Sequence, residues 1–301
     1  MRWILTLAAL VASVPLFAKT NVVTTIPDLA WLVERIGGDT VTVRPLMKGT
    51  ENPHYVDAVP DFIRRAADAD VVVLVGLDLE VGWLPKVLSR SGNAKVMTGG
   101  AGYCDASRTV TVRERPTAPV DRSMGDIHPQ GNSHYWLGPS AMAEAASAVG
   151  DCLANVDPTH AEKYRAQAVV VSKEILALRD ELKKLIPKNP GPVMEYHREF
   201  SYFFADYGLP SVGTLEEKPG LPPSAGRIAA VAMDAKTKKV RLLVGGLWAP
   251  KAHLDRFTEL SKIPALGLPT SLRPGTEIGD YPAWQRKLVA DVVRALGPAA
   301  R

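Results

Sequence analysis

The sequence predicts an α/β protein built from two Rossmann-like lobes with parallel sheets, joined by a single long rigid helix. Strand-like and helix-like segments alternate through both halves of the chain, as in parallel sheets covered by helices. Residues 70–75 are almost continuously apolar, which is typical of a strand buried on both faces. Residues 158–186 carry a helical apolar pattern that is longer than one small domain needs. The chain of 301 residues is therefore expected to form two lobes.

The first lobe is expected over residues 19–153. Residues 21–25 are β-branched and predict a strand, and the following helix begins at Pro27 and ends at Gly37-Gly38. An alanine-rich helix over 140–153 closes the lobe. The other expected elements are strands at 40–46, 70–75 and 95–98 and helices at 60–69 and 81–89. Ligands of such lobes collect at the carboxyl ends of the strands.

A linking segment is expected over residues 154–190 and the second lobe over residues 191–301. Apolar residues of the linker alternate in steps of four and three from Tyr164 to Leu185. A helix over 158–186 would be about 40 Å long and could join two lobes. The alternative is a long helix packed on a single domain. The second lobe is also α/β, with strands expected at 193–196, 240–244 and 265–268 and helices at 198–207, 224–236, 250–261 and 281–296.

The N-terminus has the features of a secretory signal peptide over residues 1–18. Arg2 supplies a positive charge, residues 4–16 are apolar, and cleavage is expected near Ala18. The apolar run is shorter than the roughly 20 residues that span a bilayer, and no cysteine follows it to carry a lipid. We therefore expect an exported protein in the periplasm. Its net charge of +4 is dispersed along the chain, which argues against a nucleic-acid partner.

The chain has two cysteines, Cys104 and Cys152, an even number that suits an oxidising compartment. A disulfide between them would close a loop of nearly fifty residues. The sequence leaves open whether the two Cα atoms approach each other. A zinc site made by these thiolates is disfavoured, because the two residues are far apart and neither has a nearby ligand partner.

Three histidines occur in similar contexts: His54, His134 and His197. Each lies in a predicted loop or at a strand end and has a tyrosine as its neighbour. Two belong to the first lobe and one to the second, so they can converge if the lobes face each other across a cleft. Three imidazoles and one carboxylate make a four-coordinate shell suited to Zn²⁺, and the carboxylate also admits Mn²⁺. The sequence therefore predicts a metal site in the interlobe cleft.

The other histidines are expected to play lesser roles. His128 is a supporting group beside the metal, a capture ligand or a plain turn residue, and we favour the turn residue. His160 and His253 lie in predicted helices and are expected to be solvated. Glu216-Glu217 offers a candidate general base, but a solvated loop is favoured there as well.

No enzyme is predicted. The sequence contains neither a His-Glu-x-x-His helix nor a Gly-x-Ser-x-Gly elbow, and Gly99–Gly102 lacks the Lys-Ser/Thr of a phosphate loop. One alternative is a secreted zinc-dependent hydrolase built on the same histidines, which would need an open coordination position and a base. A second alternative is an adhesin-like surface protein whose metal is structural.

Four segments together resemble the metal-binding subunits of ABC importers, the periplasmic zinc and manganese receptors grouped as cluster A-I. Asn52-Pro53-His54-Tyr55 resembles the family's Asp-Pro-His motif followed by an aromatic residue. Residues 131–139 resemble its Asn-Pro-His-x-Trp-Leu-Asp-Pro motif, with a serine and a glycine in place of the first proline and the aspartate. Residues 67–84 resemble its strand and Gly-x-x-x-Glu-x-Trp-Leu region, and residues 196–209 resemble its His-x-x-Phe-x-Tyr-Phe segment.

The resemblance implies two α/β lobes bridged by one rigid helix, and metal binding without chemistry. It implies His54, His134 and His197 as metal ligands and Asp280, where some members have a carboxylate, as the fourth. Water or His128 in the fourth position remains open. The implied cargo is Zn²⁺, with Mn²⁺ as the alternative, and the implied partner is the membrane permease of an ABC transporter. We expect a monomer.

Overall fold

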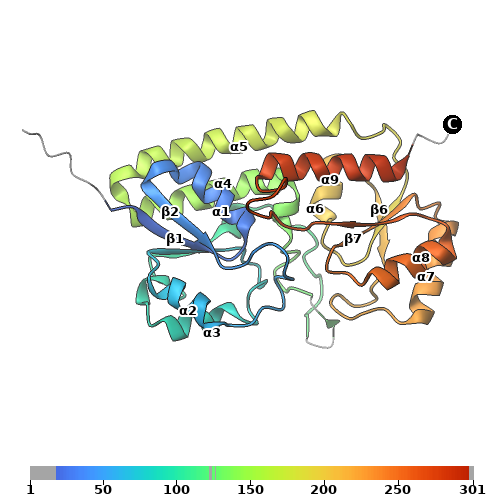
Figure 1. Ribbon diagram of the computed structural model, residues 1–301, viewed down its shortest axis with the longest axis horizontal. Helices are drawn as coiled ribbons and strands as arrows, with labels where there is room; N and C mark the ends of the chain where they lie inside the picture. Colours follow the sequence, from blue (N-terminus) through green and yellow to red (C-terminus); the bar gives the residue numbers. More distant parts are fainter. Residues whose placement is uncertain (1–17, 122–123, 126, 298–301) are drawn as a thin grey trace, which may run out of the picture.

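The computed structural model describes residues 18–121, 124–125 and 127–297, so residues 1–17 of the predicted signal peptide lie outside the described part. Figure 1 shows two lobes side by side. Each lobe is built on a four-stranded parallel sheet, with the order β2-β1-β3-β4 in the first and β6-β5-β7-β8 in the second. The predicted two-lobe α/β fold is confirmed. Among the described helices, none combines the length and the apolarity that crossing a membrane requires.

The first lobe follows the predicted alternation of strands and helices. All four residues of its strand β3 are buried, as the apolar run around 70–75 predicts for an inner parallel strand. Each of its four main helices has a proline in the first two positions, where the missing N–H costs no helical hydrogen bond. The elements are β1 (Thr20–Thr24), α1 (Pro27–Gly37), β2 (Val41–Pro45), α2 (Pro60–Ala67), β3 (Val71–Leu74), α3 (Leu84–Ser91), β4 (Tyr103–Asp105) and α4 (Pro139–Val156).

The second lobe repeats the strand order of the first, because the strand that comes first in the chain lies between the second and the third. Its strand β7 is buried throughout, and its last helix, α9, buries seven side chains against the core. The elements are β5 (Val193–Glu195), α6 (Ser201–Tyr207), β6 (Ser211–Thr214), α7 (Ala225–Thr237), β7 (Leu242–Gly246), α8 (Lys251–Ser261), β8 (Ala265–Leu268) and α9 (Tyr281–Leu296).

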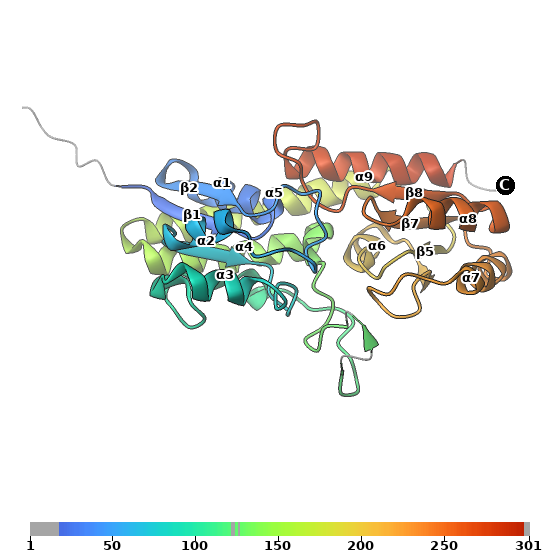
Figure 2. The same ribbon diagram turned by 60° about the horizontal axis from the view of Figure 1, so that its bottom comes forward.

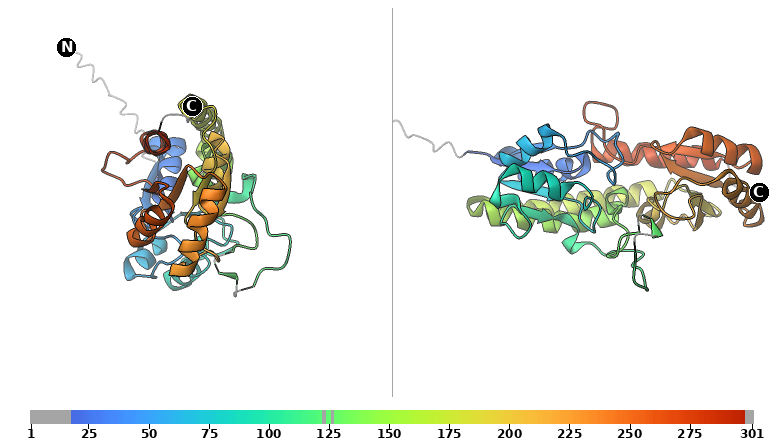
Figure 3. Two further views of the ribbon diagram at one scale, coloured as in Figure 1. Left: turned by 90° about the vertical axis from the view of Figure 1, so that its right-hand side faces the viewer. Right: turned by 90° about the horizontal axis from the view of Figure 1, so that it is seen from below.

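The long helix α5 (Ala161–Lys183) joins the lobes and is preceded by a 3-10 turn over Pro158–His160. It contacts α1 and α4 of the first lobe and α6 and α9 of the second. Figures 1 and 3 show it running along the molecule beside both lobes. The alternative of a helix packed on a single domain is therefore wrong. Its buried residues recur every three or four positions, as the sequence pattern predicts: Tyr164, Ala168, Val171, Ile175, Leu178 and Leu182.

The segment between β8 and α9 makes a second connection between the lobes. Asp28, at the start of α1, accepts hydrogen bonds from the Ser271 hydroxyl and, at 3.2 Å, from the backbone N–H of Leu272. The indole Nε1 of Trp136 donates to the carbonyl of Thr270 at 2.8 Å. One apolar core also includes side chains of both lobes. These contacts connect the two lobes in addition to α5.

The carboxyl group of Asp28 should make stability depend on pH. Burial raises its pKa to about 7, against the opposing effect of its hydrogen bonds. The folded protein then keeps a proton that the unfolded chain releases near pH 4, so this group's contribution is full below about pH 4 and is lost as the pH rises toward 7. We expect Asp28→Asn to remove this loss. Between about pH 5 and 6, the free energy of unfolding of the variant should fall with rising pH less steeply than that of the wild type, by about 1.4 kcal/mol per pH unit.

Urea denaturation of the wild type and Asp28→Asn at several pH values measures this difference. Asp206, which is less buried and caps α4 through the backbone N–H of Ser140, supplies a comparison variant, Asp206→Asn. Parallel stability curves for the wild type and Asp28→Asn would mean that folded Asp28 is already ionised in this range.

Two strands differ from the sequence prediction. Residues 95–98 were expected as a strand, but Ala94–Val96 forms a 3-10 turn whose Lys95 N–H is capped by the Asn93 side chain. Residues 99–102 then form turns, and the fourth strand of the sheet begins after them. This strand is β4, which includes Cys104. Strand β6 was not expected, because it is a half-exposed edge strand interrupted by Gly213.

Cys104 and Cys152 form a disulfide between β4 and α4, with a Cα–Cα distance of 5.8 Å.

Candidate metal centre

Three histidines from separate segments meet between the lobes. His54 lies in the loop after β2, His134 lies directly before the 3-10 turn Tyr135–Leu137, and His197 follows β5. One ring nitrogen of each lies within 4.8 Å of the other two. His134 and His197 are each 4% exposed, so their rings are almost fully withdrawn from water. His54 and His197 emerge beyond the carboxyl ends of parallel strands, where α/β lobes bind ligands.

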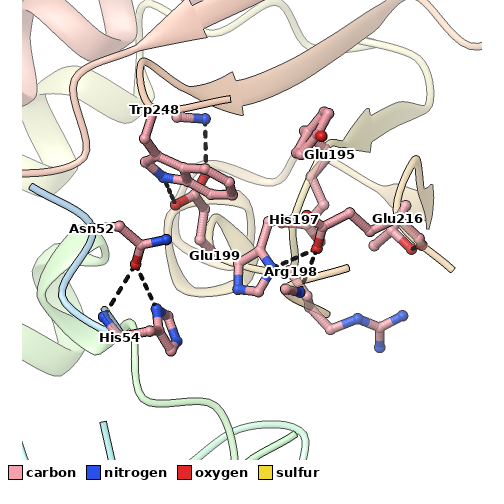
Figure 4. Close-up of polar contacts among 12 residues, drawn as sticks. Asn52, His54, Glu195, His197, Arg198, Glu199, Glu216 and Trp248 are labelled. Carbon is pink, nitrogen blue, oxygen red and sulfur yellow. Dashed lines mark hydrogen bonds and ion pairs between the residues drawn. The ribbon is translucent and has the colours of Figure 1, made fainter. Parts of the chain in front are cut away.

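Two of the histidines are oriented by the same local device, an asparagine two residues earlier. The Oδ1 atom of Asn52 accepts from the backbone N–H of His54 at 3.1 Å and from its Nδ1 at 2.9 Å, as Figure 4 shows. The Oδ1 atom of Asn132 does the same for His134, at 2.9 Å and 3.0 Å. An oxygen that accepts from Nδ1 requires the proton on that nitrogen, so each ring presents the lone pair of Nε2.

His197 is oriented by a carboxylate. Its Nδ1 lies 2.9 Å from Oε2 of Glu216, and both side chains are 4% exposed (Figure 4). The same Glu216 oxygen accepts from the backbone N–H of Gly220 at 2.8 Å, which fixes the carboxylate in turn. A histidine held by a carboxylate on one nitrogen is a stronger metal ligand through the other nitrogen. All three rings therefore have Nδ1 engaged and Nε2 available.

The protonation of the three rings differs. Burial and the neighbouring imidazoles lower the pKa of His54 and His134 well below the usual value. Burial also acts to lower the pKa of His197, but the hydrogen bond to Glu216 and the nearby carboxylates outweigh it and raise that pKa. At neutral pH His54 and His134 are neutral, which is the form that binds a metal ion.

Aromatic side chains pack against the rings of the site. The ring of Trp248 meets the ring of His197 edge-on, with 5.6 Å between the ring centroids. The ring centroids of Trp136 and His134 are 5.4 Å apart. Trp248 is itself fixed by Glu199, which accepts from its Nε1 at 3.0 Å and from the backbone N–H of Gly246 at 2.8 Å (Figure 4). Burial raises the pKa of Glu199 to about 7. The imidazoles therefore sit in a packed frame that limits their rotation.

A cavity of about 330 Å³ adjoins the rings of His134 and His197. It is lined by His128, His134 and His197 and by polar side chains of both lobes, among them Glu114, Arg198 and Glu216. The segment that carries Glu114 and His128 leaves the body of the molecule near the junction of the lobes, as the green chain in Figures 2 and 3 shows. Residues of this segment and of the second lobe together form the walls of the cavity.

The structure brings together His54, His134 and His197 but not Asp280. Within the described residues, the group of potential ligand atoms comprises the three histidines alone. Asp280 is the N-cap of α9, where its Oδ1 accepts from the backbone N–H of Ala283 at 2.9 Å. The structure thus places Asp280, predicted as the fourth ligand, outside this group: it caps α9 and lines a different surface hollow beside Trp31.

Four further expectations need correction. His128, favoured as a turn residue, places its Nε2 3.2 Å from Nε2 of His54. Glu216, favoured as solvated, is buried against His197. His160 and His253, expected to be solvated, have partners: His160 Nδ1 lies 2.6 Å from Asp157, and His253 Nδ1 lies 2.9 Å from the Tyr196 hydroxyl.

The orienting residues were missed although one signal was present. Asparagine precedes histidine by two positions at both 52–54 and 132–134, and this repeat marks a side chain that holds its own backbone and the ring. Glu216 gave no such signal, since it follows the unpredicted strand β6 and meets His197 only through the fold.

The chain matches known metal-binding proteins. Residues 22–295 match the family model described as zinc-uptake complex component A, periplasmic (ZnuA). The iron-binding protein YfeA of Yersinia pestis is 25% identical over 224 residues, which cover 72% of this chain and 67% of YfeA. The manganese-binding lipoprotein MntA of Halalkalibacterium halodurans is 25% identical over 220 residues, 71% of this chain and 67% of MntA.

Solved structures agree on the fold. A crystal structure of ZnuA aligns with a TM-score of 0.76 and 22% identity, covering 93% of this chain and 100% of the ZnuA chain. The names of the matched proteins thus cite zinc, iron and manganese.

Proposed function

The chain belongs to the ZnuA family of periplasmic zinc-uptake components, and on this premise we propose that it captures Zn²⁺ between its lobes and delivers it to an ABC importer. It is a metal-binding substrate-binding protein, and the finer assignment of zinc rests on the donor set. The observation that carries it is the convergence of three histidines whose Nδ1 atoms are all engaged, which leaves three Nε2 lone pairs for one ion.

The spacing of the three rings suits a small ion. Zinc binds imidazole nitrogens at about 2.0–2.1 Å, so the nitrogens of a tetrahedral site lie about 3.3 Å apart. The ligand atoms here already lie within 4.8 Å of one another, and small shifts of the side chains would close the shell. Three imidazoles favour zinc over manganese, which prefers oxygen ligands. Manganese remains the alternative cargo where a carboxylate enters the shell.

A transport role fits better than hydrolysis. A zinc hydrolase needs an open coordination position and a base beside it. The buried carboxylate that faces the site, Glu216, is already held by His197 and Gly220 and orients a ligand instead. We therefore propose that the protein binds and releases the metal ion without catalysing a reaction. We also propose that it is exported by a signal peptide over residues 1–18 and acts on its permease as a monomer.

Metal analysis of the purified protein tests this function. The protein is expressed without a metal-affinity tag, and bound metals are measured by mass spectrometry before and after titration against a zinc chelator. We expect one Zn²⁺ per chain, and a metal-free protein that stays folded because two complete cores support it. Absence of any stoichiometric divalent metal would overturn the function, and loss of fold on chelation would favour a structural metal.

Glu216 should tune the affinity without being a ligand. We expect Glu216→Gln to weaken zinc binding about 10- to 100-fold. The amide oxygen still accepts the hydrogen bond from Nδ1 of His197, but without the negative charge it no longer makes Nε2 of His197 a stronger metal ligand. The matched control is Glu217→Gln, the exposed neighbour that lines the same cavity. Chelator competition gives both affinities, and equal values for the two variants would remove Glu216 from the site.

A further inference from the structure

The three-histidine group leaves one position of a tetrahedral shell to be filled, and His128 lies beside it. Its Nε2 is 3.2 Å from Nε2 of His54, and the two rings stack at 5.3 Å with an interplanar angle of 23°. His128 also lines the cavity that His134 and His197 face. It lies six residues before His134, in the irregular segment that leads to the 3-10 turn Tyr135–Leu137.

The contact between His54 and His128 has the geometry of two ligands of one ion. The nitrogens of a tetrahedral zinc site lie about 3.3 Å apart, close to the 3.2 Å observed. The Nδ1 of His54 donates to Asn52, so its Nε2 offers a lone pair toward His128. Without an ion, Nε2 of His128 donates its N–H to the lone pair of His54 Nε2. With an ion between the rings, the Nε2 lone pairs of both histidines can point at the ion. His128 is outside the group whose atoms are mutually within 4.8 Å, so its ring must also turn toward His134 and His197.

The carboxylates around the cavity are less suited to the fourth position. Glu216 is held by His197 and Gly220. Glu114 accepts from the Asn132 amide at 2.8 Å and from the Ser201 hydroxyl at 3.0 Å, and so supports the residue that orients His134. Glu199, which does not line the cavity, is bound to Trp248 and Gly246. Each of these three carboxylates already has a positioning role, and Glu217, the remaining carboxylate of the lining, is exposed.

We propose that His128 is the fourth metal ligand and completes a shell of four imidazoles. This inference rests on the proposed function and deepens it by specifying the class of cargo. Four neutral nitrogen ligands suit Zn²⁺, Ni²⁺ and Cu²⁺, whereas Mn²⁺ prefers carboxylate and water oxygens. The site therefore discriminates against manganese through the absence of a carboxylate ligand.

X-ray absorption spectroscopy of the zinc-loaded protein tests the proposal by counting imidazole ligands. We expect four in the wild type and three in His128→Ala, whose zinc affinity should fall by about 100-fold, at least as much as loss of an orienting partner costs. In His128→Asp, which introduces a carboxylate at the fourth position, manganese affinity should rise relative to zinc affinity. The matched control is His160→Ala, since His160 lies beside Asp157 and outside the cavity lining.

Three outcomes are distinguishable. Fewer imidazoles and weaker zinc binding in His128→Ala, with His160→Ala unchanged, support His128 as a ligand. Three imidazoles in the wild type and unchanged affinity in His128→Ala overturn this inference, although the receptor function stands. A wild-type protein that binds no divalent metal overturns both. Circular dichroism of each variant shows whether its fold is intact.

Discussion

Replacement of His134 by alanine is expected to lower zinc affinity by roughly 100- to 1000-fold. A four-ligand zinc site binds with about 10–16 kcal/mol, so an equal share for one ligand is about 2.5–4 kcal/mol. The share of His134 should be full, because its ring is buried, neutral and oriented by Asn132. Chelator competition on the purified variant measures the loss.

The stability of the His134→Ala variant must be measured beside its zinc affinity. His134 precedes Tyr135–Leu137, whose side chains are fully buried, so truncation at 134 also leaves a hole that the thermal midpoint would reveal. Asn132→Ala separates the two effects, because it keeps the imidazole but removes its orienting oxygen, and should cost about 10- to 100-fold. Wild-type affinity in a folded His134→Ala protein would exclude His134 from the shell and with it the proposed site.

The fold was largely predictable because its elements carry strong local patterns. The apolar run of β3, the proline starts of the helices and the spacing of buried residues on α5 depend on neighbours in the sequence. Strands β4 and β6 were not predicted where they lie, because each is short and its pairing is set by the sheet. The second connection through Asp28 and Ser271 was also unpredictable, since 243 residues separate the partners.

The site divides in the same way. His54, His134 and His197 were predicted, because each sits at a loop or strand end beside an aromatic residue. The sequence surroundings of Asp280 fit a ligand and a helix cap alike, and the structure places this residue at the cap of α9. His128 and Glu216 gain their places from contacts across 74 and 19 residues, which no local pattern encodes.

The disulfide links this site to the stability of the whole lobe. It joins β4 to α4 across 48 residues and encloses the segment that carries both His128 and His134. Such a cross-link stabilises a fold mainly by restricting the unfolded chain, and a loop of this length contributes about 4 kcal/mol. Both cysteines are buried, at 1% and 7% exposure, so a reductant reaches them chiefly after the lobe has opened.

We therefore expect the double variant Cys104→Ser/Cys152→Ser to lose about 4 kcal/mol of unfolding free energy in urea denaturation. Wild-type protein unfolded with a reductant should give the same value, which controls for the burial of two hydroxyls. Zinc affinity of the folded variant should stay near the wild-type value, since His134 is held by Asn132 and not by the cross-link. Equal stabilities of the double variant and the oxidised wild type would mean that the unfolded first lobe is already compact. A large loss of affinity with the fold intact would instead show that the disulfide positions the ligands.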